Sequence, residues 1–152
     1  MNQALPSYAL RLWLRGPVIQ YLRDDVRESA LAELRQEGLS VIELDASAWL
    51  HLQDFVLAMW NALSLPTDCP PALMNLDSFL VDENPDVGLA ISIRRFDEFF
   101  RLDPHVAWQV LDMFASHSRR AIVGRKLWLV LVGCGKKYLK IKPVGARPVD
   151  GQ

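Results

Sequence analysis

The sequence lacks the features that mark secreted and membrane proteins. It has only two cysteines, Cys69 and Cys134, which are too few for a disulfide framework and favour a reduced protein. No apolar run reaches the ~18 residues of a membrane span, and the N-terminus lacks the basic and apolar regions of a signal peptide. We therefore expect a cytoplasmic protein without a membrane segment, and 152 residues suit a single domain.

Motifs for catalysis and metal binding are missing as well. The histidines are scattered, without HExxH or Cys-x-x-Cys spacing nearby: His51, His105 and His117. No GxSxG motif supplies a serine nucleophile, and "GCGKK" (133–137) lacks the first glycine of a phosphate-binding loop, because Val130 occupies that place. Asp82 and Glu83 lie beside a predicted turn, where solvation is expected. We therefore expect no enzyme, no metal and no cofactor.

Charge of one sign is absent from two long segments. Between Glu43 and Ile93 there are eight acidic residues and no Lys or Arg, whereas between Met113 and Val149 there are nine basic residues and no acidic ones. Such asymmetry bears on partners rather than on the fold. Two interpretations stay open: the halves neutralise each other on the folded surface, or the acidic segment binds a basic partner.

The hydrophobic pattern predicts alternating strands and helices. Short apolar runs predict buried strands over 40–45, 89–93 and 127–132, and helical spacing predicts helices over 23–38, 47–65 and 105–120, with a further helix through Leu73, Leu76 and Leu80. Residues 8–15 alternate apolar and polar side chains, which predicts a half-buried strand. The pattern indicates an α/β fold with a small, mainly parallel sheet covered by helices, with the strand at 8–15 at its edge.

Several segments, in this order, resemble the barstar family, the intracellular inhibitors of barnase-type ribonucleases. The resemblance covers residues 40–133 and is carried by "VIELD" (41–45), "WLHLQDFVLAMWNALSLP" (49–66), "NLDSFL" (75–80), "LAISIRRFDEF" (89–99), "VLDMFASHSRR" (110–120) and "LWLVLVG" (127–133). It implies a barstar-like domain over 40–133. Residues 1–39 would form an N-terminal β-α extension packed on the same domain, and residues 134–152 a basic, loosely held C-terminal tail.

The resemblance also implies a binding site. The family places acidic side chains of one helix and its preceding loop into the cationic active site of the nuclease. Matching Asn-Leu-Asp to this chain assigns recognition to Asn75 and Asp77, with the neighbouring carboxylates Asp68, Asp82 and Glu83 around them.

The chain departs from the family pattern in two places. The loop "TDCPPALM" is about three residues longer than in the family, and Val81 stands where a second Asp is normal. An ungapped register would instead place Met74 and Ser78 at the acidic positions. Both registers stay open.

The expected function is that of a non-catalytic inhibitor or immunity-type protein that binds a basic partner, a ribonuclease. One alternative is a nucleic-acid-binding or ribosome-associated protein that uses the basic segment 119–142, where lysines flank Tyr138. Another is a barstar-like interaction domain without inhibitory activity.

Overall fold

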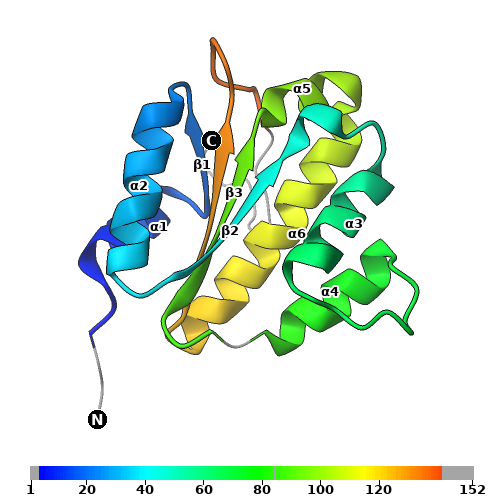
Figure 1. Cartoon of the computed structure of the whole chain (residues 1–152). Coiled ribbons are helices and arrows are strands. Elements are labelled where there is room, and N and C mark those ends of the chain that lie inside the picture. The colour runs from blue at the N-terminus through cyan, green and yellow to red at the C-terminus, as the bar shows by residue number, and fades with distance from the viewer. Residues whose placement is uncertain (1–3, 84, 142–152) are drawn as a thin grey trace, which may run out of the picture.

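The computed structural model describes residues 4–83 and 85–141, which form a four-stranded sheet and six α-helices (Figure 1). The helices are α1 (Ser7–Arg15), α2 (Asp24–Gln36), α3 (Leu52–Ala62), α4 (Leu73–Asp82), α5 (Phe96–Leu102) and α6 (Pro104–Val123). The strands are β1 (Val18–Tyr21), β2 (Ser40–Asp45), β3 (Gly88–Arg94) and β4 (Leu127–Gly133). The expected α/β fold class is confirmed.

All four strands are parallel, in the order β1-β4-β3-β2. The central register aligns Ile42 with Ile91 and Ile91 with Val130, and β1 joins the far side of β4 by pairing Val18 with Val130. The chain runs across the sheet from β1 to β2 and then returns through β3 to β4. Connections between parallel strands are right-handed, so connections that cross the sheet in opposite directions place their helices on opposite faces. Helices α1 and α2 lie on one face, and α3–α6 lie on the other (Figure 1).

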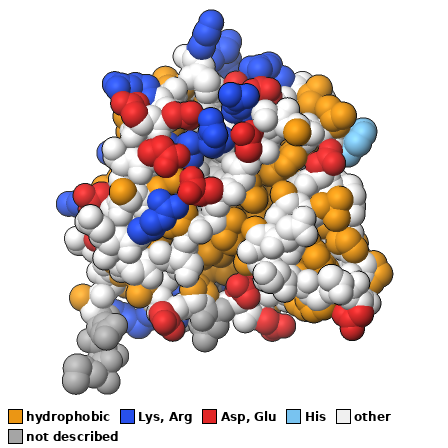
Figure 2. All heavy atoms as spheres, in the orientation of Figure 1, with side chains coloured by type: hydrophobic (Ala, Val, Ile, Leu, Met, Phe, Trp, Pro, Cys, Tyr) orange, Lys and Arg blue, Asp and Glu red, His pale blue; other side chains and the backbone are white. Residues whose placement is uncertain are grey.

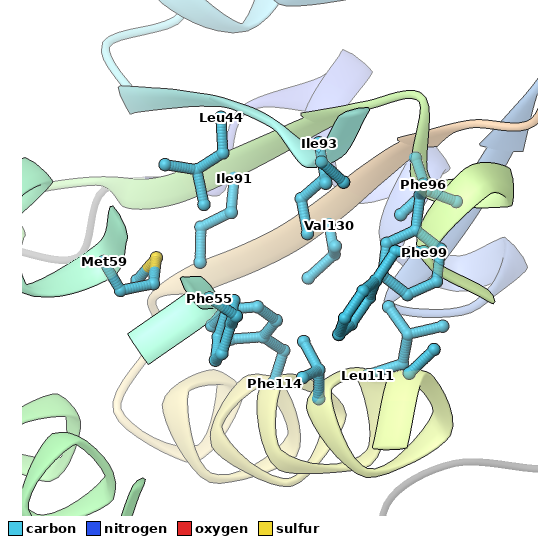
Figure 3. Packing of buried hydrophobic residues seen from close by; sticks show 14 of the residues in the cluster. Leu44, Phe55, Met59, Ile91, Ile93, Phe96, Phe99, Leu111, Phe114 and Val130 are labelled. Carbon is cyan, nitrogen blue, oxygen red and sulfur yellow. The ribbon is translucent and has the colours of Figure 1, made fainter. Parts of the chain in front are cut away.

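Each face of the sheet has its own apolar core. Ile91, Ile93 and Val130 face α3, α5 and α6, where they meet an aromatic cluster (Figure 3). This cluster contains edge-to-face ring pairs that join Trp49, Phe55, Phe96, Phe99 and Phe114. Leu127, Leu129 and Leu131 alternate with these positions and face α1 and α2. Burial on both faces explains why β4 is apolar throughout and why β3 is apolar apart from Ser92 and Arg94.

The prediction of a strand over 8–15 is wrong, because these residues form α1. The segment satisfies both periods: besides alternating, it places Ala9 and Leu12 on one helical stripe, and these are the residues that become buried. A group that stabilises the helix over the strand, the Glu37 carboxylate, lies far along the chain. The Glu37 carboxylate accepts the backbone N–H groups of Tyr8 and Ala9 at 2.9 and 2.8 Å, which satisfies the exposed donors of the first helical turn. The edge strand of this region is β1, which was not expected.

The helix expected over 47–65 is shorter than predicted. Residues Ala46–Ala48 form a 3₁₀ turn, and α3 begins only at Leu52. The break is fixed by Asp54, whose carboxylate accepts the N–H groups of Leu50 and His51 at 2.8 and 3.0 Å. These two bonds lower the pKa of Asp54 below its usual value.

The segment after β4 is held more firmly than expected for residues 134–141. The Gln20 side chain accepts the N–H of Leu139 at 2.7 Å and donates to its carbonyl at 3.2 Å. Leu139 and Ile141 pack against the larger core. Cys134 is buried there, which raises the pKa of its thiol to about 11. The rest of the expected tail, 142–152, lies outside the described residues.

Candidate functional site

Helix α4, which carries the predicted recognition residues, is anchored on its inner side. Leu76 and Leu80 are buried against α3 and α6, and Phe79 contacts Trp60 edge-to-face. The preceding loop is tied down by Asn75, which donates to the carbonyl of Pro70 at 2.8 Å. Asn75 thus holds the loop on the helix in this structure.

The outer side of α4 presents a mixed apolar and acidic stripe. We call this the α4 surface and define it as Met74, Asp77, Ser78, Val81 and Asp82, all exposed. Met74 is 80% exposed and Val81 52%, although both are large hydrophobic residues. Over α3 and α4, Figure 2 shows hydrophobic and acidic side chains without Lys or Arg.

Asp77 is fixed on this stripe by a buried histidine. Its Oδ1 lies 2.7 Å from Nε2 of His117 on α6. The Asp77 side chain is 55% exposed and that of His117 only 4%. Since an ionised carboxylate can only accept, His117 donates from Nε2. Asp77 therefore keeps a solvent-facing part while one oxygen is held in place.

His117 is the residue of this candidate site that the sequence interpretation missed. Its ring stacks on Trp128 of β4, with centroids 5.6 Å apart and planes at 30°. The sequence contained a signal, because His117 follows Val110 by seven residues and Phe114 by three, which places it on the buried stripe of α6. What the sequence did not contain was the identity of its partner.

The remaining predicted residues do not gather around Asp77. Asp68 is exposed in the loop before α4, and Asp82 and Glu83 are exposed at its other end. Ten helical residues span ~15 Å, so these carboxylates mark opposite ends of α4. The structure thus gives an elongated acidic surface instead of a compact cluster.

Basic groups lie near the carboxyl end of α4. Glu83 lines a hollow of about 180 Å³ between α4 and α6 together with Arg120, Lys126, His117 and Trp128. Neutralisation between the two halves of the chain therefore applies near the carboxyl end of α4. Within the described residues, Asp68, Asp82 and Glu83 make no ion pair.

Three of the eight acidic residues in the segment have local roles. Glu43 pairs with Arg35 at 2.7 Å. Asp45 accepts the N–H of Ser47, which lowers the pKa of its carboxyl group, and Asp54 fixes the start of α3. The carboxylates that remain for binding are those of α4 and the loops on either side of it.

The basic segment 119–142 does not form one patch. Arg120 and Lys126 lie before β4, whereas Lys136 and Lys140 follow it. The seven residues of β4 separate these groups by ~20 Å, at opposite ends of the sheet. Lys142 lies outside the described residues.

The carboxyl ends of the strands form the place where open α/β sheets commonly bind ligands. A hollow of about 390 Å³ opens there, lined by Asp24, Arg95, Asp97 and Glu98 together with Leu22 and two glycines. Asp24 begins α2, and Asp97 and Glu98 lie in the first turn of α5. Carboxylates thus occupy the helix starts where a phosphate would otherwise bind, so this hollow does not favour a nucleotide.

Over residues 4–83 and 85–141, no group of three or more His, Cys, Asp or Glu side chains is arranged to hold a metal ion. None of the helices in this part is long and apolar enough to cross a membrane. No protein-family model matches the chain, nor does any curated protein or solved structure. The geometry of α4 and its surroundings therefore carries the functional argument.

Proposed function

We propose that this chain is a cytoplasmic, non-catalytic inhibitor of the barstar type, which binds a basic protein partner, a barnase-like ribonuclease, through the α4 surface. The observation that carries the proposal is Asp77, an exposed carboxylate on an outward stripe that His117 holds in place. The resemblance of "NLDSFL" to the family's recognition helix assigns the same residue to partner binding.

Physical chemistry supports an acidic binding surface of this kind. A carboxylate that is already oriented loses less conformational freedom when a partner's Arg or Lys binds to it. Complementary charge also speeds encounter, and close charge pairs across an interface can be strongly coupled. Met74 and Val81 would supply the apolar contacts that surround such a pair.

A second candidate is an interaction domain of the same fold that binds a partner without inhibiting a nuclease. Val81, at the place of the family's second acidic residue, is 52% exposed. An exposed valine there gives the stripe one charge fewer and more apolar area. That surface suits a partner with a smaller cationic site.

The test is titration of a barnase-type ribonuclease with the protein at low ionic strength, with RNA cleavage as the readout. We expect stoichiometric inhibition that weakens as salt is added. The variant Asp77→Asn with Asp82→Asn should inhibit about tenfold more weakly or worse, because two interface charges are lost. Asparagine at 77 keeps an oxygen for the His117 bond, so the fold is spared.

The matched control neutralises two carboxylates on the opposite face of the sheet, Asp25→Asn with Glu33→Gln on α2. It has the same net charge as the test variant and should inhibit like the unchanged protein. Full inhibition by the Asp77→Asn, Asp82→Asn variant would contradict the site. Binding to the nuclease without inhibition would favour the second candidate.

A further inference from the structure

A third hollow lies away from α4, where α5 meets α6. It has a volume of about 350 Å³ and is lined by Phe100, Pro104, His105, Trp108 and Lys140. Three of these side chains carry rings with an aromatic face, and one carries an ammonium group. The volume falls within the range of small-molecule sites, which are mainly apolar with a few placed polar groups.

The chain holds the walls of this hollow in place. Asp103 accepts the N–H of Val106 at 3.2 Å and Pro104 begins α6, so the turn that presents His105 is fixed. On the other wall, the two hydrogen bonds between Gln20 and Leu139 anchor the backbone next to Lys140. The ammonium therefore belongs to a segment whose path is set by the sheet.

We propose that this hollow binds a small planar aromatic molecule that bears a carboxylate. The faces of Trp108 and Phe100 suit a flat ring, since aromatic pairs gain from stacked and edge-on contact beyond their buried area. Lys140 makes no ion pair with any of the described residues and supplies the opposite charge. Among the described residues, Lys140 is the only Lys or Arg of the lining, whereas a nucleic-acid strand is bound along a track of several cations.

The site is distinct from the α4 surface. Trp108 and His117 are nine residues apart on α6, which corresponds to ~14 Å along the helix axis. Failure of the proposed inhibitor function would therefore leave this inference standing, and the reverse also holds.

The test uses 2-naphthoate as the probe and the uncharged 2-naphthamide as its isostere, with titration calorimetry and the indole N–H resonances of the full chain as readouts. We expect naphthoate to shift the resonance of Trp108 and to bind more tightly than naphthamide. Lys140→Gln should lower the affinity for naphthoate about twofold to fivefold, the range for exposed ion pairs, and leave the affinity for naphthamide unchanged. Trp108→Leu should lower the affinity for both ligands.

The matched control is Lys137→Gln, which removes an exposed charge outside the lining and should leave both affinities unchanged. Three outcomes would overturn the proposal: equal affinity of the unchanged protein for naphthoate and naphthamide, equal weakening by the two lysine variants, or naphthoate binding that persists in Trp108→Leu. Binding of a single-stranded oligouridylate at Trp108 without naphthoate binding would also overturn it, in favour of a nucleic-acid site.

Discussion

At the scale of single residues, Asp77 has two tasks, one structural and one that we propose. Its exposed part is available to a partner, and its Oδ1 satisfies the buried imidazole of His117. A buried polar group that loses its hydrogen bond costs free energy, whereas an exposed carboxylate can return to water. The two tasks can therefore be separated by the choice of substitution.

We predict that Asp77→Ala lowers the free energy of unfolding by about 1–3 kcal/mol, because it leaves His117 without its partner. Asp82→Ala removes an exposed carboxylate without an ion pair among the described residues and should change stability by less than about 0.5 kcal/mol. Urea unfolding followed by tryptophan fluorescence measures both.

Asp77→Asn is the control for this prediction, since it keeps the acceptor and should fall between the other two variants. A double-mutant cycle with His117→Phe, which retains a ring against Trp128, isolates the coupling between the two side chains. Equal stability of the Asp77→Ala and Asp82→Ala variants would show that the His117 bond contributes nothing.

The candidate site could be predicted from the sequence only in part. Asp77 follows from the motif and from the lack of basic neighbours in the segment 43–93. The bond to His117 could not be predicted, because it depends on how α4 crosses α6, and 40 residues separate the two side chains. The sequence pattern also missed that Asn75 bonds its own loop.

At the scale of elements, helix ends depend on carboxylates that are not always adjacent in sequence. Glu37 satisfies the start of α1 from the far end of α2. Asp54 satisfies the start of α3 from within the same helix. Only a carboxylate within its own helix, such as Asp54, leaves a local sequence pattern. This is why a helix near 52–62 was predictable and α1 was not.

We predict a pH-dependent contribution from Asp54. Its pKa is lowered in the folded protein by the N–H bonds of Leu50 and His51, so its ionised form stabilises the fold above the unfolded pKa, about 3.8. That contribution is lost as the pH falls through the lower, folded pKa. The stability difference between the unchanged protein and Asp54→Asn should therefore be constant near neutral pH and shrink below about pH 3.8.

The measurement is the urea midpoint of both proteins between neutral pH and pH 2.5 or so. Asp68→Asn serves as a control, because Asp68 is exposed and makes no ion pair with any of the described residues. A difference for Asp54→Asn that stays constant across the acid range would contradict the assigned role.

At the scale of the whole molecule, residues 4–39 complete the sheet and cover one of its faces. Helices α1 and α2 bury Ala90, Leu127, Leu129 and Leu131. Residues 40–133 contain most of the core on the other face. Resemblance over 40–133 therefore does not make that segment independent of the first 39 residues.

We predict that a chain of residues 40–152 does not fold to a stable monomer. Exposing the three leucines alone costs about 1.5–3 kcal/mol each, which together approaches the whole stability of a typical domain. Circular dichroism and size-exclusion chromatography, with the full chain as reference, would show loss of helix or association. A monomeric, cooperatively unfolding fragment would contradict this prediction.

The layered α/β arrangement was predictable because apolar strands alternate with amphipathic helices. The identity of the edge strand was not. β1 is only four residues long and half-buried throughout, so its sequence carries little periodic signal, and it is defined by pairing with β4. The prediction placed the edge strand at 8–15 instead, because so short a segment fits both the strand period and the helix period.

The pairing of β1 with β4 also has a consequence for how the chain folds during synthesis. Helices α1 and α2 and strand β1 are synthesised before β4, so they leave the ribosome before the apolar surface that they cover exists. Contacts between distant segments form slowly, and apolar helices without a partner are prone to association. The nascent chain is therefore expected to depend on chaperone binding over its first 39 residues until β4 has emerged.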